Sequence, residues 1–395
     1  MSAPARPCRV GPDAKPSVVI EALRRHVDAY VARHGYDPAR MHVLRQLLAC
    51  RTAKLGAHLC VCESCGWKAP AYNSCRNRHC PQCQGHATAL WLEARTERML
   101  STPHFQVVFT LPAQLRPVAF ANQKLVYGLL FQAASSVLRD LAAQRLDARL
   151  GMTAVLHTWT TELSYHPHVH FLVSAGGLSR DDERWVASRE NYLFPGRIMG
   201  AMFRGRFLEA LIDAFDRGDL DVGRGVGAAK AFRATVRTLS KRHARWVVHV
   251  EPPEGRPVET VTKYLARYVK RVAIADARIV AVTDTDVTFQ SRRDLLTLDG
   301  AEFVRRFLLH VLPRGFRKVR HYGLYAPGNA NDRLETARGL LPRQSGESAG
   351  PEDVGAVAAD APTGARLEVC PQCGEAGVRR VVPVRRFLER PRGPP

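Results

Sequence analysis

The distribution of cysteine along the chain is the feature that most limits how it can fold. Six of the ten cysteines fall between residues 60 and 83, where two Cys-x-x-Cys pairs are separated by 14 residues. In a reducing compartment, clustered pairs of this kind hold a metal ion more often than they form disulfides. Because four thiolates fit the tetrahedral coordination of Zn²⁺, we predict one structural zinc ion bound by Cys62, Cys65, Cys80 and Cys83.

Two further residues of this cluster, Cys75 and His79, stand between the pairs as substitute ligands or as ligands of a second ion. A separate pair, Cys370 and Cys373, lies near the C-terminus without a second pair nearby. One Cys-x-x-Cys supplies only half of a tetrahedral site. Metal binding by this pair therefore requires closure by a distant residue or by another chain.

Composition and charge indicate a folded protein with a polyanionic partner. Of the 395 residues, 46% are apolar and 24% charged, and 58 Lys and Arg against 37 Asp and Glu give a net charge of +21. This excess favours phosphate contacts, so nucleic acid is the expected partner. Since no apolar run approaches the ~18 residues of a membrane span and the first residues lack a signal-peptide pattern, we expect a cytoplasmic protein without a membrane partner.

The pattern of expected elements favours an α+β fold. Helical periodicity at 17–57 precedes the cysteine cluster, and strands and helices beyond residue 101 interleave without a regular βα repeat. After about 335 the composition becomes rich in Gly, Ala, Pro and Ser, which is typical of a flexible linker. We predict five segments: a helical adaptor at 1–57, a zinc-binding domain at 58–100, a catalytic domain at 101–335, a linker at 336–366 and a basic tail at 367–395.

Two histidines mark a candidate metal site. His168 and His170 lie two residues apart in an apolar run that is typical of a β-strand. Residues i and i+2 of a strand project from the same face, so both imidazoles can reach one ion. Glu162 and His166 are alternative third ligands, and the sequence leaves the choice open.

Two tyrosines mark a candidate nucleophile site. Tyr264 and Tyr268 are spaced i and i+4 on an expected helix at 257–275, so they share one helix face. A phenol is a poor nucleophile at neutral pH, but a metal ion on the scissile phosphate and nearby cations make its attack feasible. The cations expected to bind DNA around the tyrosines are Lys263, Arg267, Lys270 and Arg271.

These motifs in this order resemble the rolling-circle transposases of the insertion-sequence-91 family, two-tyrosine members of the His-hydrophobe-His endonuclease superfamily. The resemblance runs from about residue 40 to 340 and rests on six segments: residues 49–53 (ACRTA), 72–84 (YNSCRNRHCPQCQ), 104–112 (HFQVVFTLP), 166–170 (HPHVH), 263–268 (KYLARY) and 307–323 (FLLHVLPRGFRKVRHYG).

The resemblance implies an antiparallel sheet with helices, preceded by a transposase zinc-binding domain. It implies that His168 and His170 hold Mg²⁺ or Mn²⁺ and that Tyr264 and Tyr268 are the nucleophiles. Such enzymes nick single-stranded DNA at a transposon end and pass the strand to a target DNA. The alternatives are a rolling-circle replication initiator or relaxase, which shares this chemistry, and a non-catalytic zinc-dependent DNA-binding protein, which needs neither the histidines nor the tyrosines.

Overall fold

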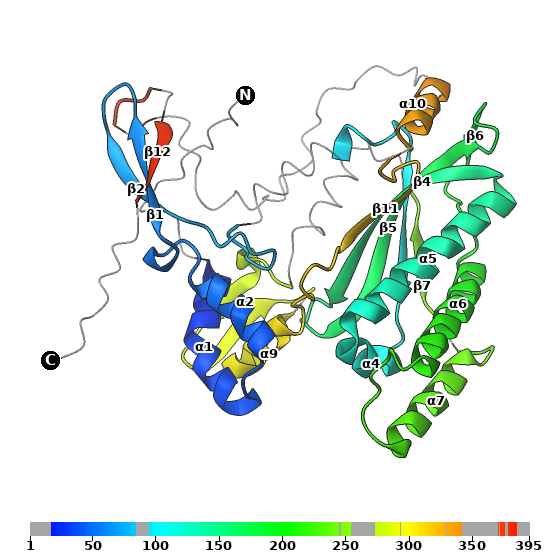
Figure 1. Ribbon diagram of the computed structural model, residues 1–395, viewed down its shortest axis with the longest axis horizontal. Helices are drawn as coiled ribbons and strands as arrows, with labels where there is room; N and C mark the ends of the chain where they lie inside the picture. The colour runs from blue at the N-terminus through cyan, green and yellow to red at the C-terminus, as the bar shows by residue number, and fades with distance from the viewer. Residues whose placement is uncertain are drawn as a thin grey trace. The chain divides into compact units, whose positions relative to one another are not determined.

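The computed structural model describes residues 17–83, 95–244, 246–253, 273–292, 294–328, 330–341, 370, 372–375 and 378–384. The chain divides into two compact units, which Figure 1 draws with the element labels used below. The first unit combines Met1–Ala89, Lys270–Val311 and Gly350–Pro395, and the second combines Leu90–Val269 and Leu312–Ala349. Each unit therefore contains segments that are distant in the sequence.

The second unit is built on an antiparallel sheet. Among the described residues it has the order β11-β4-β5-β3-β7, with the short β6 paired to β5. The central strand β5 pairs with β4 on one side and β3 on the other. The strands are β3 (His104–Thr110), β4 (Ala148–Trp159), β5 (Tyr165–Ser179), β6 (Trp185–Ala187), β7 (Val248–Glu251) and β11 (Val319–Gly323).

In the described part of the chain, the helices α5 and α6 pack on one face of this sheet, and the histidines of β5 project from the opposite face. Along β5, Val169, Phe171 and Val173 are fully buried and alternate with His168 and His170. Phe109 of β3 meets the Phe203 ring of α6 at 5.2 Å, so α6 packs on the aromatic face, and α5 lies beside it (Figure 1). The helices are α4 (Arg116–Ala121), α5 (Gln123–Arg145), α6 (Gly196–Asp216), α7 (Val226–Ser240) and α10 (Ala330–Leu340).

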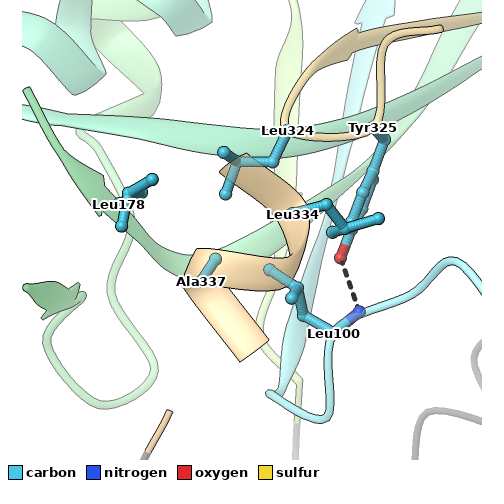
Figure 2. Close-up of a cluster of buried hydrophobic side chains, with 6 residues drawn as sticks. All are labelled: Leu100, Leu178, Leu324, Tyr325, Leu334 and Ala337. Atoms are coloured by element: carbon cyan, nitrogen blue, oxygen red, sulfur yellow. Dashed lines mark hydrogen bonds between the residues drawn. The ribbon is translucent and has the colours of Figure 1, made fainter. Parts of the chain in front are cut away.

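Figure 2 shows the apolar cluster that attaches α10 to this unit. Leu334 and Ala337 of α10 are buried against Leu100, and the backbone N–H of Leu100 donates to the Tyr325 hydroxyl at 3.3 Å. The predicted linker at 336–366 is corrected in its first residues, because burial of one face keeps the chain helical to Leu340. Residues 342–366 lie outside the described part of the chain.

The first unit contains the predicted N-terminal helices. Ser17 caps α1 (Val18–His34) and Asp37 caps α2 (Pro38–Leu48), and both caps accept hydrogen bonds from the first helical turn. A three-stranded sheet with the order β10-β9-β8 and the helix α9 also belong to this unit. Their bounds are Ile279–Val282 for β8, Asp286–Gln290 for β9, Leu295–Asp299 for β10 and Gly300–Leu308 for α9.

Contacts between α1 and α9 correct the predicted domain boundaries. The sequence assigned residues 270–311 to the catalytic domain, whereas they fold with the N-terminal helices. Arg33 pairs with Asp299 at 2.7 Å, and the His26 ring packs directly on Gly300, where a Cβ would lie 2.1 Å from the ring. The charge pair and this close approach join two segments that are distant in the sequence.

A second small sheet of the first unit joins a strand near the C-terminus to a hairpin at residues 57–72. It has the order β12-β1-β2, where β1 (Ala57–Cys62) pairs antiparallel with β2 (Lys68–Tyr72) and with β12 (Val378–Val384). The predicted α+β class is confirmed. In the described ranges, no helix combines the length and the apolar character needed to cross a membrane.

Candidate metal centre and nuclease site

Three histidines converge on the sheet face opposite α5 and α6. His168 and His170 project from β5, as the i, i+2 spacing predicted, and His157 of β4 lies directly opposite His168 in the strand pairing. Directly opposite residues of an antiparallel pair share a face, so all three imidazoles point the same way. One donor nitrogen of each lies within 4.8 Å of the others.

This spacing suits one metal ion. The ring centroids are 5.3 Å apart for His157 and His168, 4.4 Å for His157 and His170, and 4.9 Å for His168 and His170. Two nitrogens on one ion lie at most ~4.2 Å apart when each bond is ~2.1 Å, so small side-chain rotations complete the contact. The donor set is therefore three imidazoles on rigid, adjacent strands.

Hydrogen bonds and burial prepare two of the rings as ligands. The Nδ1–H of His168 donates to the carbonyl oxygen of His166 at 2.6 Å, which leaves Nε2 as the donor atom for a metal. Nδ1 of His170 lies 3.2 Å from the side-chain amide of Gln106 on β3. Burial lowers the pKa of His168 to about 4 and that of His170 to about 3, so both are neutral at pH 7.

Neither predicted third ligand belongs to the cluster. Nδ1 of His166 accepts a hydrogen bond from Arg116 at 2.7 Å, and Glu162 accepts one from the hydroxyl of Thr161. Both residues lie at the turn end of β5, whereas the third imidazole comes from the neighbouring strand. His157 was missed because its place beside His168 depends on strand pairing and not on sequence spacing.

An aromatic and two cationic side chains flank the triad. The Trp159 ring stacks on His157 with centroids 4.7 Å apart and planes 20° apart, and Lys318 Nζ lies 5.7 Å from the centre of the same indole. Arg116 is connected to the triad through His166, whose ring lies 5.2 Å from that of His168. Two cationic side chains and the flat ring of Trp159 therefore lie next to the histidine triad.

The predicted nucleophiles and cations lie outside the described residues. This applies to residues 257–272 of the helix expected at 257–275 and to the predicted site residues in it, namely Tyr264, Tyr268, Lys263, Arg267, Lys270 and Arg271. Their roles remain predictions from the sequence. Residues 273–275 are described and are not helical, so the predicted C-terminal end of this helix is corrected.

The cysteines of the first unit form two tetrads instead of one. Cys50, at the end of α2, joins Cys75, Cys80 and Cys83, with the Cys50 sulfur 3.3 Å from that of Cys83 and 3.6 Å from that of Cys80. Sulfurs on one zinc ion lie ~3.8 Å apart, so this set fits a tetrahedral site.

The other tetrad contains Cys62, Cys65, Cys370 and Cys373. The predicted ligand set is therefore corrected, because the β1–β2 hairpin carries Cys62 and Cys65 away from Cys80 and Cys83. Cys75 is a member of the first tetrad, as the sequence allowed, whereas the Nδ1 atom of His79 bonds to the side chain of Asn77 at 2.9 Å. Cys50 was missed because it stands alone, 25 residues before Cys75.

Comparison with known proteins agrees with these features. Residues 22–111 match the family described as a transposase zinc-binding domain, and residues 151–333 match the family described as a putative transposase. The putative transposase y4qJ of Sinorhizobium fredii is 42% identical over 346 residues, which are 84% of this chain and 85% of that protein. This chain belongs to the transposases of the insertion-sequence-91 family.

A second relative of this transposase is named as the transposase for insertion sequence element IS801 of Pseudomonas savastanoi pv. phaseolicola. It is 27% identical over 314 residues, which are 74% of this chain and 72% of that protein. No solved structure matches the transposase. The matched regions contain the histidine triad and the first tetrad, whereas Cys370 and Cys373 lie beyond both.

Proposed function

We propose that this transposase nicks and rejoins single-stranded DNA at the ends of its element through a 5′-phosphotyrosine intermediate, and that this chemistry drives rolling-circle transposition. The observation that carries the proposal is the convergence of His157, His168 and His170 on one face of the paired strands β4 and β5. A purely structural role for these three imidazoles would not require their donor nitrogens to meet at one point.

The triad is proposed to hold the catalytic divalent ion. Its three nitrogen donors favour Mn²⁺ over Mg²⁺, since Mg²⁺ prefers an oxygen shell. When bound, the ion polarises the scissile phosphate and stabilises the charge that develops on it. The strand pairing places His157 opposite His168, and Gln106 contacts the ring of His170. Because these contacts already hold the three rings near one another, the side chains need little rearrangement when the ion binds.

Tyr264 and Tyr268 are proposed to be the nucleophiles. The phenolic oxygen attacks the phosphorus, a Tyr–O–P bond forms, and the bond from phosphorus to the 3′ oxygen of the upstream nucleotide breaks. The phenol proton leaves, and the departing 3′ oxygen takes up a proton. Since the phosphotyrosine keeps the energy of the phosphodiester, the reverse attack by a 3′-hydroxyl rejoins the strand without ATP.

The side chains around the triad suit a single DNA strand. The Trp159 indole offers a flat surface for an unpaired base, while Lys318 and Arg116 lie where backbone phosphates would pass. The net charge of +21 adds a salt-dependent attraction for DNA of any sequence. We therefore expect single strands from the transposon ends, and then a target DNA, as the substrates.

Cys50, Cys75, Cys80 and Cys83 are proposed to bind the structural zinc ion of the matched zinc-binding domain. Four sulfur donors leave no open coordination position, so this ion stabilises the fold and takes no part in strand cleavage. A non-catalytic zinc-dependent DNA-binding protein would need this tetrad and the positive charge, but it would have no use for the histidine triad.

The test is a search for the covalent intermediate. The full chain is incubated with Mn²⁺ and a single-stranded oligonucleotide from an end of its element, labelled at the 3′ end, and then denatured in detergent. We expect the label to migrate with the protein, because the tyrosine retains the 5′ phosphate of the downstream fragment. The same oligonucleotide labelled at its 5′ end should release a shorter free strand.

The control is the double variant Tyr264→Phe/Tyr268→Phe, which should form no adduct while it binds the oligonucleotide as tightly as the unchanged chain. An adduct in the double variant would refute the tyrosine mechanism. Binding without any adduct in the unchanged chain, with Mn²⁺ or Mg²⁺, would favour the non-catalytic binder.

A further inference from the structure

Two short segments that lie far apart in the sequence have matching backbone hydrogen bonds. The hairpin knuckle (residues 62–66, Cys-Glu-Ser-Cys-Gly) connects β1 to β2, and the tail knuckle (residues 370–374, Cys-Pro-Gln-Cys-Gly) precedes β12. Each consists of a Cys-x-x-Cys pair followed directly by glycine.

The backbone hydrogen bonds of the two knuckles correspond one to one. The final glycine donates its N–H to the carbonyl of the first cysteine, at 3.0 Å for Gly66 and 2.9 Å for Gly374. The first cysteine of each donates its N–H to the carbonyl five residues ahead, at 2.8 Å in both. The two glycines have φ values of +72° and +75°, a conformation that glycine adopts without strain.

The knuckles face each other through their sulfur atoms. The Cys62 sulfur lies 3.7 Å from that of Cys373, and the Cys65 sulfur lies 3.6 Å from that of Cys370, so both contacts cross from one knuckle to the other. Sulfurs around a zinc ion are separated by ~3.8 Å, because the Zn–S bonds are ~2.3 Å in a tetrahedron. Cys62 and Cys370 are buried, while Cys65 and Cys373 are exposed.

Strand pairing brings the knuckles together independently of their sulfurs. The strand β12 follows the tail knuckle and pairs antiparallel with β1, from Cys62 opposite Val378 to Ala57 opposite Val384. Figure 1 shows the red strand β12 against the blue strand β1. The sheet therefore sets the tail knuckle beside the hairpin knuckle, in a position to share one ion.

We infer that the hairpin and tail knuckles bind a second zinc ion, which clasps the C-terminal tail to the N-terminal hairpin. Four thiolates favour Zn²⁺ over the oxygen-seeking ions and close its coordination shell, so the role of this ion is structural. It is separate from the tetrad of Cys50, Cys75, Cys80 and Cys83, and half of its ligands lie beyond the matched zinc-binding domain. The inference does not depend on the proposed nuclease activity.

Metal content of purified full-length chains provides the test. Elemental analysis and native mass spectrometry should find two zinc ions per unchanged chain. The tail variant Cys370→Ser/Cys373→Ser and the hairpin variant Cys62→Ser/Cys65→Ser should each retain one. The quadruple variant should also retain one, because the two knuckles serve the same ion.

Matched controls change the exposed, sulfur-free positions of the same knuckles. Ser64→Ala and Gln372→Ala should both keep two zinc ions, whereas Cys75→Ser/Cys80→Ser should lose the other ion and keep the clasp. One zinc ion in the unchanged chain, two in the tail variant, or iron in place of zinc would overturn the inference. Loss of both ions in the tail variant, with the remaining tetrad still folded, would also contradict it.

A second measurement reports on the clasp without any cysteine substitution in the hairpin. A chain that ends at residue 369 removes the tail knuckle and β12, and reconstitution with Co²⁺ should then give half of the sulfur-to-cobalt charge-transfer absorbance of the full chain. Hydrogen exchange in the tail variant should become faster at residues 378–384, because this strand loses the zinc ion that attaches the preceding knuckle to the hairpin. Unchanged absorbance after truncation, or unchanged exchange at 378–384, would refute the clasp.

Discussion

His157 of β4 and His168 of β5 stand directly opposite each other in the strand pairing, and their rings meet nearly edge to face with centroids 5.3 Å apart. The His-x-His spacing on β5 supplies two nitrogen donors, and this cross-strand pair adds His157 as the third. The sheet register therefore adds His157, a residue outside the predicted motif, as the third candidate ligand.

The first prediction is that His157→Ala weakens Mn²⁺ binding as strongly as His168→Ala does. Loss of a residue that only supports a metal ligand costs ~10–100-fold in metal affinity, so loss of a ligand should cost about 100-fold or more. Calorimetric Mn²⁺ titration of the zinc-loaded chain measures the effect. His166→Ala is the matched control, because that ring bonds to Arg116 and lies outside the triad; equal losses in both variants would argue against His157 as a ligand.

The second prediction separates the two tyrosines. If one tyrosine holds the donor 5′ end while the other makes a later cut, at least one of Tyr264→Phe and Tyr268→Phe should still form a single adduct but should not complete a second cleavage. An oligonucleotide that carries two cleavage sites, with a different label on each fragment, distinguishes these products. Tyr192→Phe, at an exposed tyrosine of the second unit, should behave like the unchanged chain. Retention of both cleavages in each single variant would show that two tyrosines are not needed.

The sequence predicts those structural features that depend on local spacing. The alternation of β5 placed His168 and His170 on one face because side chains of a strand alternate, and this requires no knowledge of the neighbouring strands. The same holds for the helices α1 and α2, which the periodicity of the apolar residues predicts.

What could not be predicted depends on pairing between distant segments. His157 joins the triad through the β4–β5 register, which bulges at 150–152 and 157–159 alter. The cysteines were grouped by proximity in sequence, but the hairpin at β1–β2 and the arrival of β12 regroup them into two tetrads. Likewise, α9 joins the first unit through its packing on α1, and no local pattern encodes that contact.

The third prediction concerns the pH dependence of folding and rests on His104. Burial lowers the pKa of His104 to about 4, and its Nε2 lies 2.7 Å from the Tyr325 hydroxyl. The unfolded chain binds a proton at this residue below pH ~6.5, whereas the folded chain does not bind it until pH falls to about 4. The contribution of His104 to the free energy of unfolding is therefore highest above pH ~6.5. Because of His104 the free energy of unfolding falls by about 3 kcal/mol in total as the pH drops from ~6.5 to about 4.

The measurement is the free energy of unfolding in urea at several pH values between 7 and about 4. His104→Gln should be less stable at pH 7 but should show a flatter decline, because the proton uptake at this position is gone. An identical slope in His104→Gln would mean that other groups account for the acid sensitivity.

The fourth prediction concerns the place where Tyr325 packs on the sheet. A Cβ added at Gly151 of β4 would lie 2.6–2.8 Å from three atoms of the Tyr325 ring, which is fully buried in the cluster of Figure 2. The ring is held by its hydrogen bonds to Leu100 and His104, so it has little freedom to move away. Gly151→Ala should therefore lower the free energy of unfolding by about 1–3 kcal/mol, the usual cost of overpacking a core.

A second glycine provides the matched comparison for Gly151→Ala. Gly128 lies within α5 and has open space where a Cβ would be added, so Gly128→Ala should raise the free energy of unfolding by about 0.5–1 kcal/mol. Urea unfolding of both variants under the same conditions gives effects of opposite sign if the close approach of Tyr325 to β4 is real. Equal stabilisation in the two variants would show instead that the ring leaves room for a methyl group, and α10 would then be attached to the sheet more loosely than the buried cluster implies.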